Sequence, residues 1–83
     1  MKKSIANKEY DTDTAHLVGK VVVGRFGDSD GYEEALFVSD GGNYFLYVNG
    51  GEDSPYPRED IKRISKAKAE IWQRENAGRI RGV

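Results

Sequence analysis

The chain has 83 residues, with 13 Lys and Arg, 14 Asp and Glu, and no Cys. A chain this short is expected to form one domain over residues 1–83, because domains usually have about 100 residues or more. The lack of Cys excludes disulfides, thiolate metal sites and Cys nucleophiles, and is typical of a reducing compartment. Neither a membrane helix of roughly 18 apolar residues nor a signal peptide behind Lys2 and Lys3 is predicted, so we expect a cytoplasmic protein.

Charge is distributed unevenly along the chain, although the net charge is only −1. Residues 9–60 contain twelve acidic and three basic side chains, whereas residues 61–83 contain seven basic and two acidic ones. Such segregation can steer a charged partner toward one face of a protein. The alternative is that the acidic and basic segments neutralise each other across the fold.

The N-terminal half predicts short strands separated by turns. Residues 5–11 are expected to form one short strand, and the Asp and Thr side chains of residues 11–16 favour a turn. The β-branched run 17–26 predicts a strand that is bent or bulged at Gly19 and Gly24. Residues 27–31 then predict a loop, because Gly, Asp and Ser favour turn geometry.

Two further strands are predicted to form a hairpin. Residues 32–39 and 44–48 alternate in the manner of strands, and residues 40–43 (Asp-Gly-Gly-Asn) favour a tight turn. The strand 44–48 is apolar on both faces, which predicts that it is central and that a helix covers one face. Alternation also places Glu33 and Glu34 on opposite faces.

The C-terminal third has two interpretations. One long helix could begin at Pro57 and end near Glu75. Alternatively, residues 60–64 form an edge strand, and Ser65 caps a helix over residues 66–76. In that helix, two pairs of apolar residues have helical spacing, at positions 69 and 72 and at positions 67 and 71. Ser65 is the better capping residue, so the second interpretation is preferred. Residues 78–83 are expected to form a flexible basic tail.

Together these elements predict an α+β fold, with a small antiparallel sheet of three to five strands and one C-terminal helix packed on one face. No catalytic set can be assembled from the residues, so an enzyme is not expected. His16 is the only histidine, and its spacing from Asp11 and Asp13 matches no standard metal site. The acidic segment that starts at Asp28 lacks the ligand spacing of a calcium loop. We therefore predict no metal and no cofactor.

Binding remains as the expected class of function. The first hypothesis is that exposed acids bind a basic protein surface by mimicking phosphates electrostatically. The residues expected to carry this are Asp28, Asp30, Glu33, Glu34, Glu52 and Asp53. The alternative is a small nucleic-acid-associated or regulatory module that uses Trp72, Arg74, Arg79 and Arg81. A third option is an accessory protein that oligomerises through a strand edge.

Several segments carry a family resemblance that covers residues 10–72. They are residues 10–15 (Tyr-Asp-Thr-Asp-Thr-Ala), 18–19 (Val-Gly), 32–37 (Tyr-Glu-Glu-Ala-Leu-Phe), 42–47 (Gly-Asn-Tyr-Phe-Leu-Tyr), 50–51 (Gly-Gly) and 64–65 (Ile-Ser), with Ala69 and Trp72. Together they resemble a family of short proteins encoded by bacterial phages, plasmids and conjugative elements. The family often has a proline before the Ile-Ser pair, where this sequence has Arg63.

Some small proteins similar to that family are linked to inhibition of CRISPR-Cas effectors. The resemblance thus implies a non-catalytic, anti-CRISPR-like inhibitor from a mobile element, whose partner is a host CRISPR-Cas effector. In that case, the acidic surface would block nucleic-acid binding or cleavage by the effector. The family provides no functional residues to transfer to this sequence.

Overall fold

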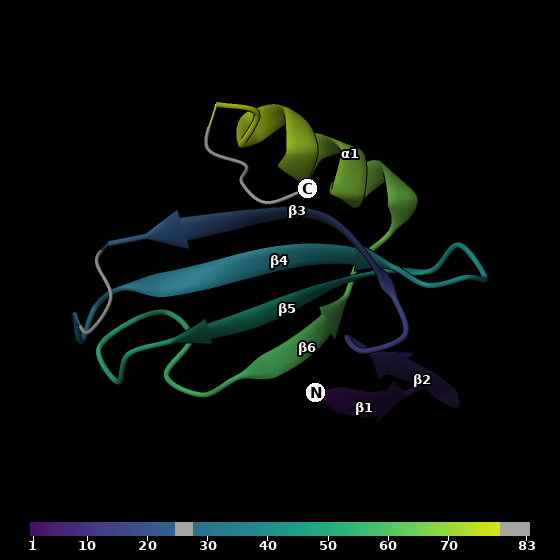
Figure 1. The fold of residues 1–83 in the computed structure, drawn as a ribbon, viewed down its shortest axis with the longest axis horizontal. Helices are drawn as coiled ribbons and strands as arrows, with labels where there is room; N and C mark the ends of the chain where they lie inside the picture. Colours follow the sequence, from purple (N-terminus) through teal and green to yellow (C-terminus); the bar gives the residue numbers. More distant parts are fainter. Residues whose placement is uncertain (25–27, 79–83) are drawn as a thin grey trace.

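The protein is described from a computed structural model, which covers residues 1–24 and 28–78 (Figure 1). Four antiparallel strands form the main sheet in the order β3-β4-β5-β6, a second sheet pairs β1 with β2, and one helix, α1, follows. The bounds are β1 Lys2–Ile5, β2 Lys8–Asp11, β3 His16–Val23, β4 Tyr32–Val38, β5 Tyr44–Gly50, β6 Asp60–Arg63 and α1 Lys66–Glu75. The α+β fold predicted from the sequence is therefore confirmed. The predicted basic tail lies almost entirely outside the described residues, as do Arg25 and Phe26.

The main sheet is a meander in which each strand pairs with the next one in sequence. In β3 the register shifts between Leu17 and Gly19, which confirms the bulge predicted at this glycine. The turn after β4 is tight, and Gly42 adopts a φ of 82°, a conformation that glycine accepts without steric cost. Strand β5 lies between β4 and β6 and is therefore internal, as its two apolar faces predict.

Each face of the main sheet has its own apolar core. On one face, α1 contributes Ala69 and Trp72, which pack with Val21 of β3 and Leu36 of β4. On the other face, Tyr10 of the β1–β2 hairpin packs with Phe45 and Ile61. In Figure 1, α1 lies above β3 and the hairpin lies below β6. The sheet is thus covered on both faces, although the sequence predicted only the helix.

The C-terminal third adopts the preferred interpretation, and the single long helix is wrong. Strand β6 ends at Arg63, and Ser65 then caps α1 by accepting a hydrogen bond from the Lys68 backbone N–H at 3.1 Å. Of the two spaced pairs predicted in the helix, only positions 69 and 72 are buried. Ala67 and Ile71 are exposed, because they lie on the opposite side of the helix.

The N-terminal segment differs from the single strand predicted at residues 5–11. It forms a hairpin, in which Ala6 and Asn7 have φ values of 50° and 66° and connect β1 to β2. Two consecutive positive φ values make a turn whose twist suits a hairpin. The sequence signal was weak because this turn uses Ala-Asn where Asn-Gly, Asp-Gly or Gly-Gly is usual. The hairpin positions Tyr10, whose ring meets Phe45 edge-on at 5.4 Å.

Candidate functional site

The acidic loops predicted to bind a partner lie side by side at one end of the main sheet (Figure 1). The Gly51 N–H donates to the Gly31 carbonyl at 2.9 Å, and the Asp53 N–H donates to the Ser29 carbonyl at 2.9 Å. A Cβ at Gly51 would lie 2.2 Å from the Ser29 carbonyl oxygen, so only glycine permits this approach. The two loops are therefore one connected surface, although the bonded residues are 20 and 24 positions apart in sequence.

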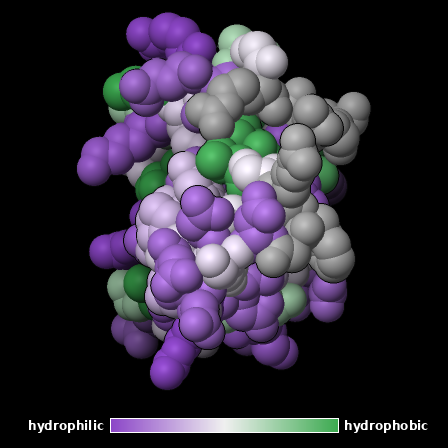
Figure 2. Space-filling model, turned by 90° about the vertical axis from the view of Figure 1, so that its left-hand side faces the viewer, coloured by the Kyte–Doolittle hydropathy of each residue, from purple (hydrophilic) through white to green (hydrophobic). Residues whose placement is uncertain are grey.

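Five of the six predicted partner-binding acids belong to this surface, which we call the acidic end. Its residues are Asp28, Asp30, Glu33, Glu52 and Asp53, and all except the half-buried Glu33 are exposed. Figure 2 views the molecule from this end and shows hydrophilic side chains gathered over its lower half. The topology thus brings together acids from two separate segments of the chain.

A shallow hollow of about 670 Å³ lies among these acids. Asp28, Glu33 and Glu52 contribute to its lining, together with the apolar side chains of Val22 and Tyr32. Val22 is 47% exposed, which is high for a valine in a strand. Carboxylates beside exposed apolar surface suit Lys and Arg side chains, because these have an apolar stem and a charged head.

The sixth predicted acid, Glu34, has a different role. Its carboxylate accepts hydrogen bonds from Trp72 Nε1–H at 3.2 Å and from the Tyr56 hydroxyl at 2.6 Å, on the face that α1 covers. Burial, and then the bond to Glu34, raise the pKa of the Tyr56 phenol to about 12. Glu34 therefore stabilises the fold from within and does not belong to the acidic end. The prediction that Glu33 and Glu34 point to opposite faces is confirmed.

Ion pairs do not join the acidic end to the basic C-terminal segment within the described residues. Three ion pairs are present there, and they join Lys3 to Asp60 at 2.6 Å, His16 to Asp40 at 2.7 Å and Lys20 to Glu33 at 3.0 Å. Only the last one involves the acidic end. Over residues 1–24 and 28–78, the two charged segments are thus not paired with each other by salt bridges.

Of the alternative nucleic-acid site, only Trp72 and Arg74 belong to the described residues. Trp72 is only 8% exposed and packs in the core, so its ring is not available to stack on a base. Arg74 is exposed in the last turn of α1. Arg79 and Arg81 lie outside the described residues.

Two of the three aromatic residues of β5, Phe45 and Tyr47, are not offered to a base either. Phe45 is fully buried, and its ring stacks on Phe37 with a centroid distance of 5.4 Å. The Tyr47 hydroxyl donates to Glu59 at 2.8 Å, while burial, followed by this bond, raises the pKa of Tyr47 to about 12. These rings therefore stabilise the sheet and its connection to β6.

The described residues offer no cluster of three or more His, Asp or Glu side chains that could hold a metal ion. Within residues 1–24 and 28–78, His16 at the start of β3 pairs only with Asp40, which follows β4. In the same part of the chain, α1 is too short and too polar to cross a bilayer, and it is the only helix there.

Comparisons with known proteins add no relative. No protein-family model matches the sequence, and neither a curated protein nor a solved structure matches it.

Sequence reasoning missed two features of the site. The first is the contact between the two acidic loops, for which the pair Gly50 and Gly51 was the available signal. A Cβ at Gly50 would lie 2.7 Å from the Tyr32 Cβ, so both glycines mark a close approach. The second is the apolar part of the hollow. It was missed because strand alternation alone does not reveal that the Val22 side chain is exposed.

Proposed function

We propose that this protein is a non-catalytic inhibitor that binds a cationic, nucleic-acid-binding surface of a bacterial defence protein through its acidic end. The observation that supports the proposal is the joining of two acidic loops by backbone hydrogen bonds into one surface. A preorganised surface loses little conformational freedom on binding, which favours affinity. The exposed carboxylates of Asp30, Glu52 and Asp53 on these joined loops can replace the phosphates that a cationic groove normally binds.

The hollow gives this surface a means of selecting its partner. A Lys or Arg side chain can place its charged head near Glu33 or Glu52 while its stem covers Val22. Salt screens the charges but not the apolar contact. We therefore expect binding that weakens with salt without being abolished by it.

A CRISPR-Cas effector is the proposed partner, and the bacterial cytoplasm is the proposed location. The sequence resemblance to short phage and plasmid proteins supports this choice. An effector also offers the required chemistry, because it holds a nucleic-acid heteroduplex in a positively charged channel. An inhibitor that occupies such a channel needs affinity and no catalytic residues.

The test compares two triple charge reversals in binding to a panel of purified effector complexes. The first variant, D30K/E52K/D53K, reverses the acidic end at exposed positions. The matched control, E9K/D13K/E70K, makes the same change in net charge at exposed positions elsewhere. Binding is measured by biolayer interferometry, and inhibition by the cleavage of target DNA.

We expect the unmodified protein to bind at least one effector and to inhibit its cleavage of DNA. The D30K/E52K/D53K variant should bind roughly 100-fold more weakly or worse, because like charges then face each other. The control should stay within about threefold of the unmodified protein. Equal loss of binding in both variants, or binding that neither variant alters, would reject the acidic end as the binding surface.

A further inference from the structure

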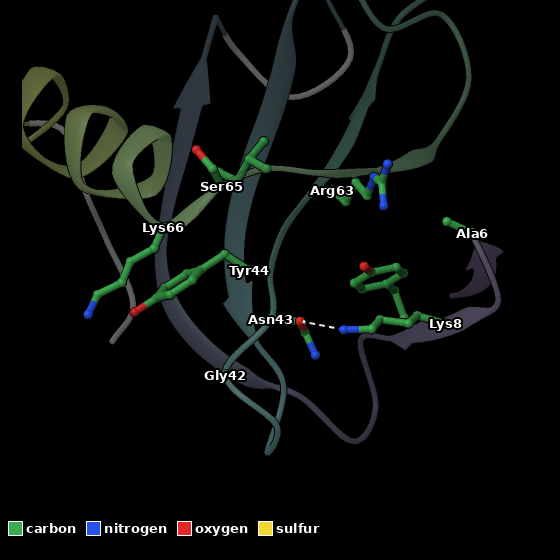
Figure 3. A pocket seen from close by; sticks show the side chains of 10 residues that line it. Ala6, Lys8, Gly42, Asn43, Tyr44, Arg63, Ser65 and Lys66 are labelled. Carbon is green, nitrogen blue, oxygen red and sulfur yellow. Dashed lines mark hydrogen bonds between the residues drawn. The ribbon is translucent and has the colours of Figure 1, made fainter.

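A pocket of about 420 Å³ lies at the opposite end of the main sheet from the acidic end. It is formed where three parts of the fold meet, namely the β1–β2 hairpin, the turn between β4 and β5, and the junction of β6 with α1. Figure 3 shows Lys8 and Arg63 on one side of the pocket, Tyr44 and Lys66 on the other, and Asn43 between them. Its size is within the range of small-ligand sites, which is roughly 300–1,000 Å³.

The charged side chains that line the pocket are all basic. Lys8 comes from β2, Arg63 from the end of β6 and Lys66 from the start of α1, and no acidic residue is among the described residues that line the pocket. Arg63 and Lys66 form no ion pair with any residue in the described ranges. Three basic side chains from separate elements thus border one pocket, which gives it a positive potential that favours an anion.

The backbone and neutral side chains around these bases add to the same preference. The first turn of α1 has no acidic residue, so nothing there offsets the positive end of the helix dipole. Asn43 fixes the Lys8 ammonium, because its side-chain oxygen accepts a hydrogen bond from Lys8 Nζ at 3.1 Å. The Arg63 guanidinium can bind two oxygens of one phosphate at once.

We propose that this pocket binds the phosphate group of a nucleotide, either free or at the end of a nucleic-acid strand. Arg63 and Lys66 bind the phosphate oxygens, Lys8 contributes a third positive charge, and Tyr44 borders the space left for the nucleoside. The proposal is independent of the acidic end, since the two surfaces share no residue.

The test uses isotope-labelled protein and NMR titration with five probes: inorganic phosphate, adenosine 5′-monophosphate, adenosine, and a six-nucleotide DNA strand in two forms, with and without a 5′-phosphate. We expect the phosphate-bearing probes to shift the backbone amide signals of Ser65 and Lys66, and adenosine to leave them unchanged. A phosphorylated strand that binds more tightly than the mononucleotide identifies a strand end as the source. Similar affinities identify the free nucleotide, and both results support the site.

Two double variants test the assignment of residues. R63Q/K66Q removes one Arg and one Lys from the pocket, and should weaken phosphate binding about tenfold or more, because hydrogen bonds to charged groups are lost. K68Q/R74Q removes the same charge from exposed positions outside the pocket. This control should change the affinity for phosphate by less than about twofold. Circular dichroism should confirm that both variants are folded, as Arg63 and Lys66 are exposed.

Equal weakening in the two variants would overturn the proposal, because it would indicate attraction by overall charge alone. Signal shifts that occur only away from Ser65 and Lys66 would overturn it too. The D30K/E52K/D53K variant should keep phosphate binding at the pocket, which separates this test from that of the inhibitor function.

Discussion

The two ends of the main sheet differ in charge and in construction. The acidic end consists of two loops, which are held together by backbone hydrogen bonds across Gly51. The basic pocket at the other end is built from regular elements: a hairpin, a tight turn and the first turn of a helix. The acidic end therefore depends on one close backbone contact, whereas the basic end depends on where secondary structures begin and end.

The comparison shows how a meander sorts charges that the sequence leaves scattered. In four antiparallel strands, the first and third connections lie at one end of the sheet and the second lies at the other. Asp28 and Asp30 belong to the first connection, Glu52 and Asp53 to the third, and Glu33 lies at the start of β4, so the topology gathers these acids. Arg63 is the last residue of the last strand and Lys66 follows it, so both are placed at the other end.

The largest expected effect is the loss of stability when the two loops of the acidic end are forced apart. In G51A, the new Cβ would meet backbone atoms of Ser29 at 2.2–2.7 Å, so the loops must separate. We expect the free energy of unfolding to fall by about 3 kcal/mol, the upper range for an overpacked site. The control is G41A at the opposite end, where the nearest atom is the flexible Asn43 side-chain nitrogen at 3.3 Å. Urea unfolding that gave equal losses for both variants would contradict the loop contact.

The next largest effect distinguishes the roles of two neighbouring acids on β4, Glu33 and Glu34. E34Q replaces a carboxylate that accepts from both Trp72 and Tyr56, and should cost about 1–2 kcal/mol of unfolding free energy because charge-assisted bonds are lost. E33Q removes only a partly exposed pair with Lys20, and should cost about 0–1 kcal/mol. Thermal unfolding followed by Trp72 fluorescence compares them. A cost for E33Q as large as that for E34Q would mean that Glu34 is not the internal acid.

A smaller effect tests the construction of the basic end. S65A removes the side-chain cap of α1, and should lower the unfolding free energy by about 1 kcal/mol. S4A, at an exposed position on β1, should leave it nearly unchanged. Denaturation by urea measures both variants. If S65A is as stable as S4A, the helix start at this end does not depend on its cap.

The smallest effect concerns the ion pair that joins the hairpin to β6. The hydrogen bond from Lys3, and then that from the Ile61 N–H, lower the pKa of Asp60 below its usual value of 3.8. A lowered pKa stabilises the fold above pH 3.8, and this contribution is lost as the pH falls through the Asp60 pKa of the folded state. Both side chains are 40% exposed, so the pair contributes only about 0.2–1 kcal/mol. Acid unfolding of K3Q should therefore begin at slightly higher pH than that of K2Q.

Much of the fold was predictable because its signals are local. Alternation in residues 32–48 and the Asp-Gly-Gly-Asn turn predict the central hairpin, and Ser65 predicts the start of the helix. The β1–β2 hairpin was missed, since Ala6 and Asn7 are an unusual turn pair. The internal role of Glu34 depends on Trp72, 38 residues later, and no local pattern reveals such a contact.

The most direct measurement of the central claim is the salt dependence of the rate at which the protein associates with a CRISPR-Cas effector. The account predicts that this rate falls steeply between about 50 and 300 mM salt, because the acidic end steers the encounter with a cationic groove. For D30K/E52K/D53K, the rate should be low and should no longer fall as salt rises. Equal rates and equal salt dependence for this variant and the unmodified protein would contradict the claim.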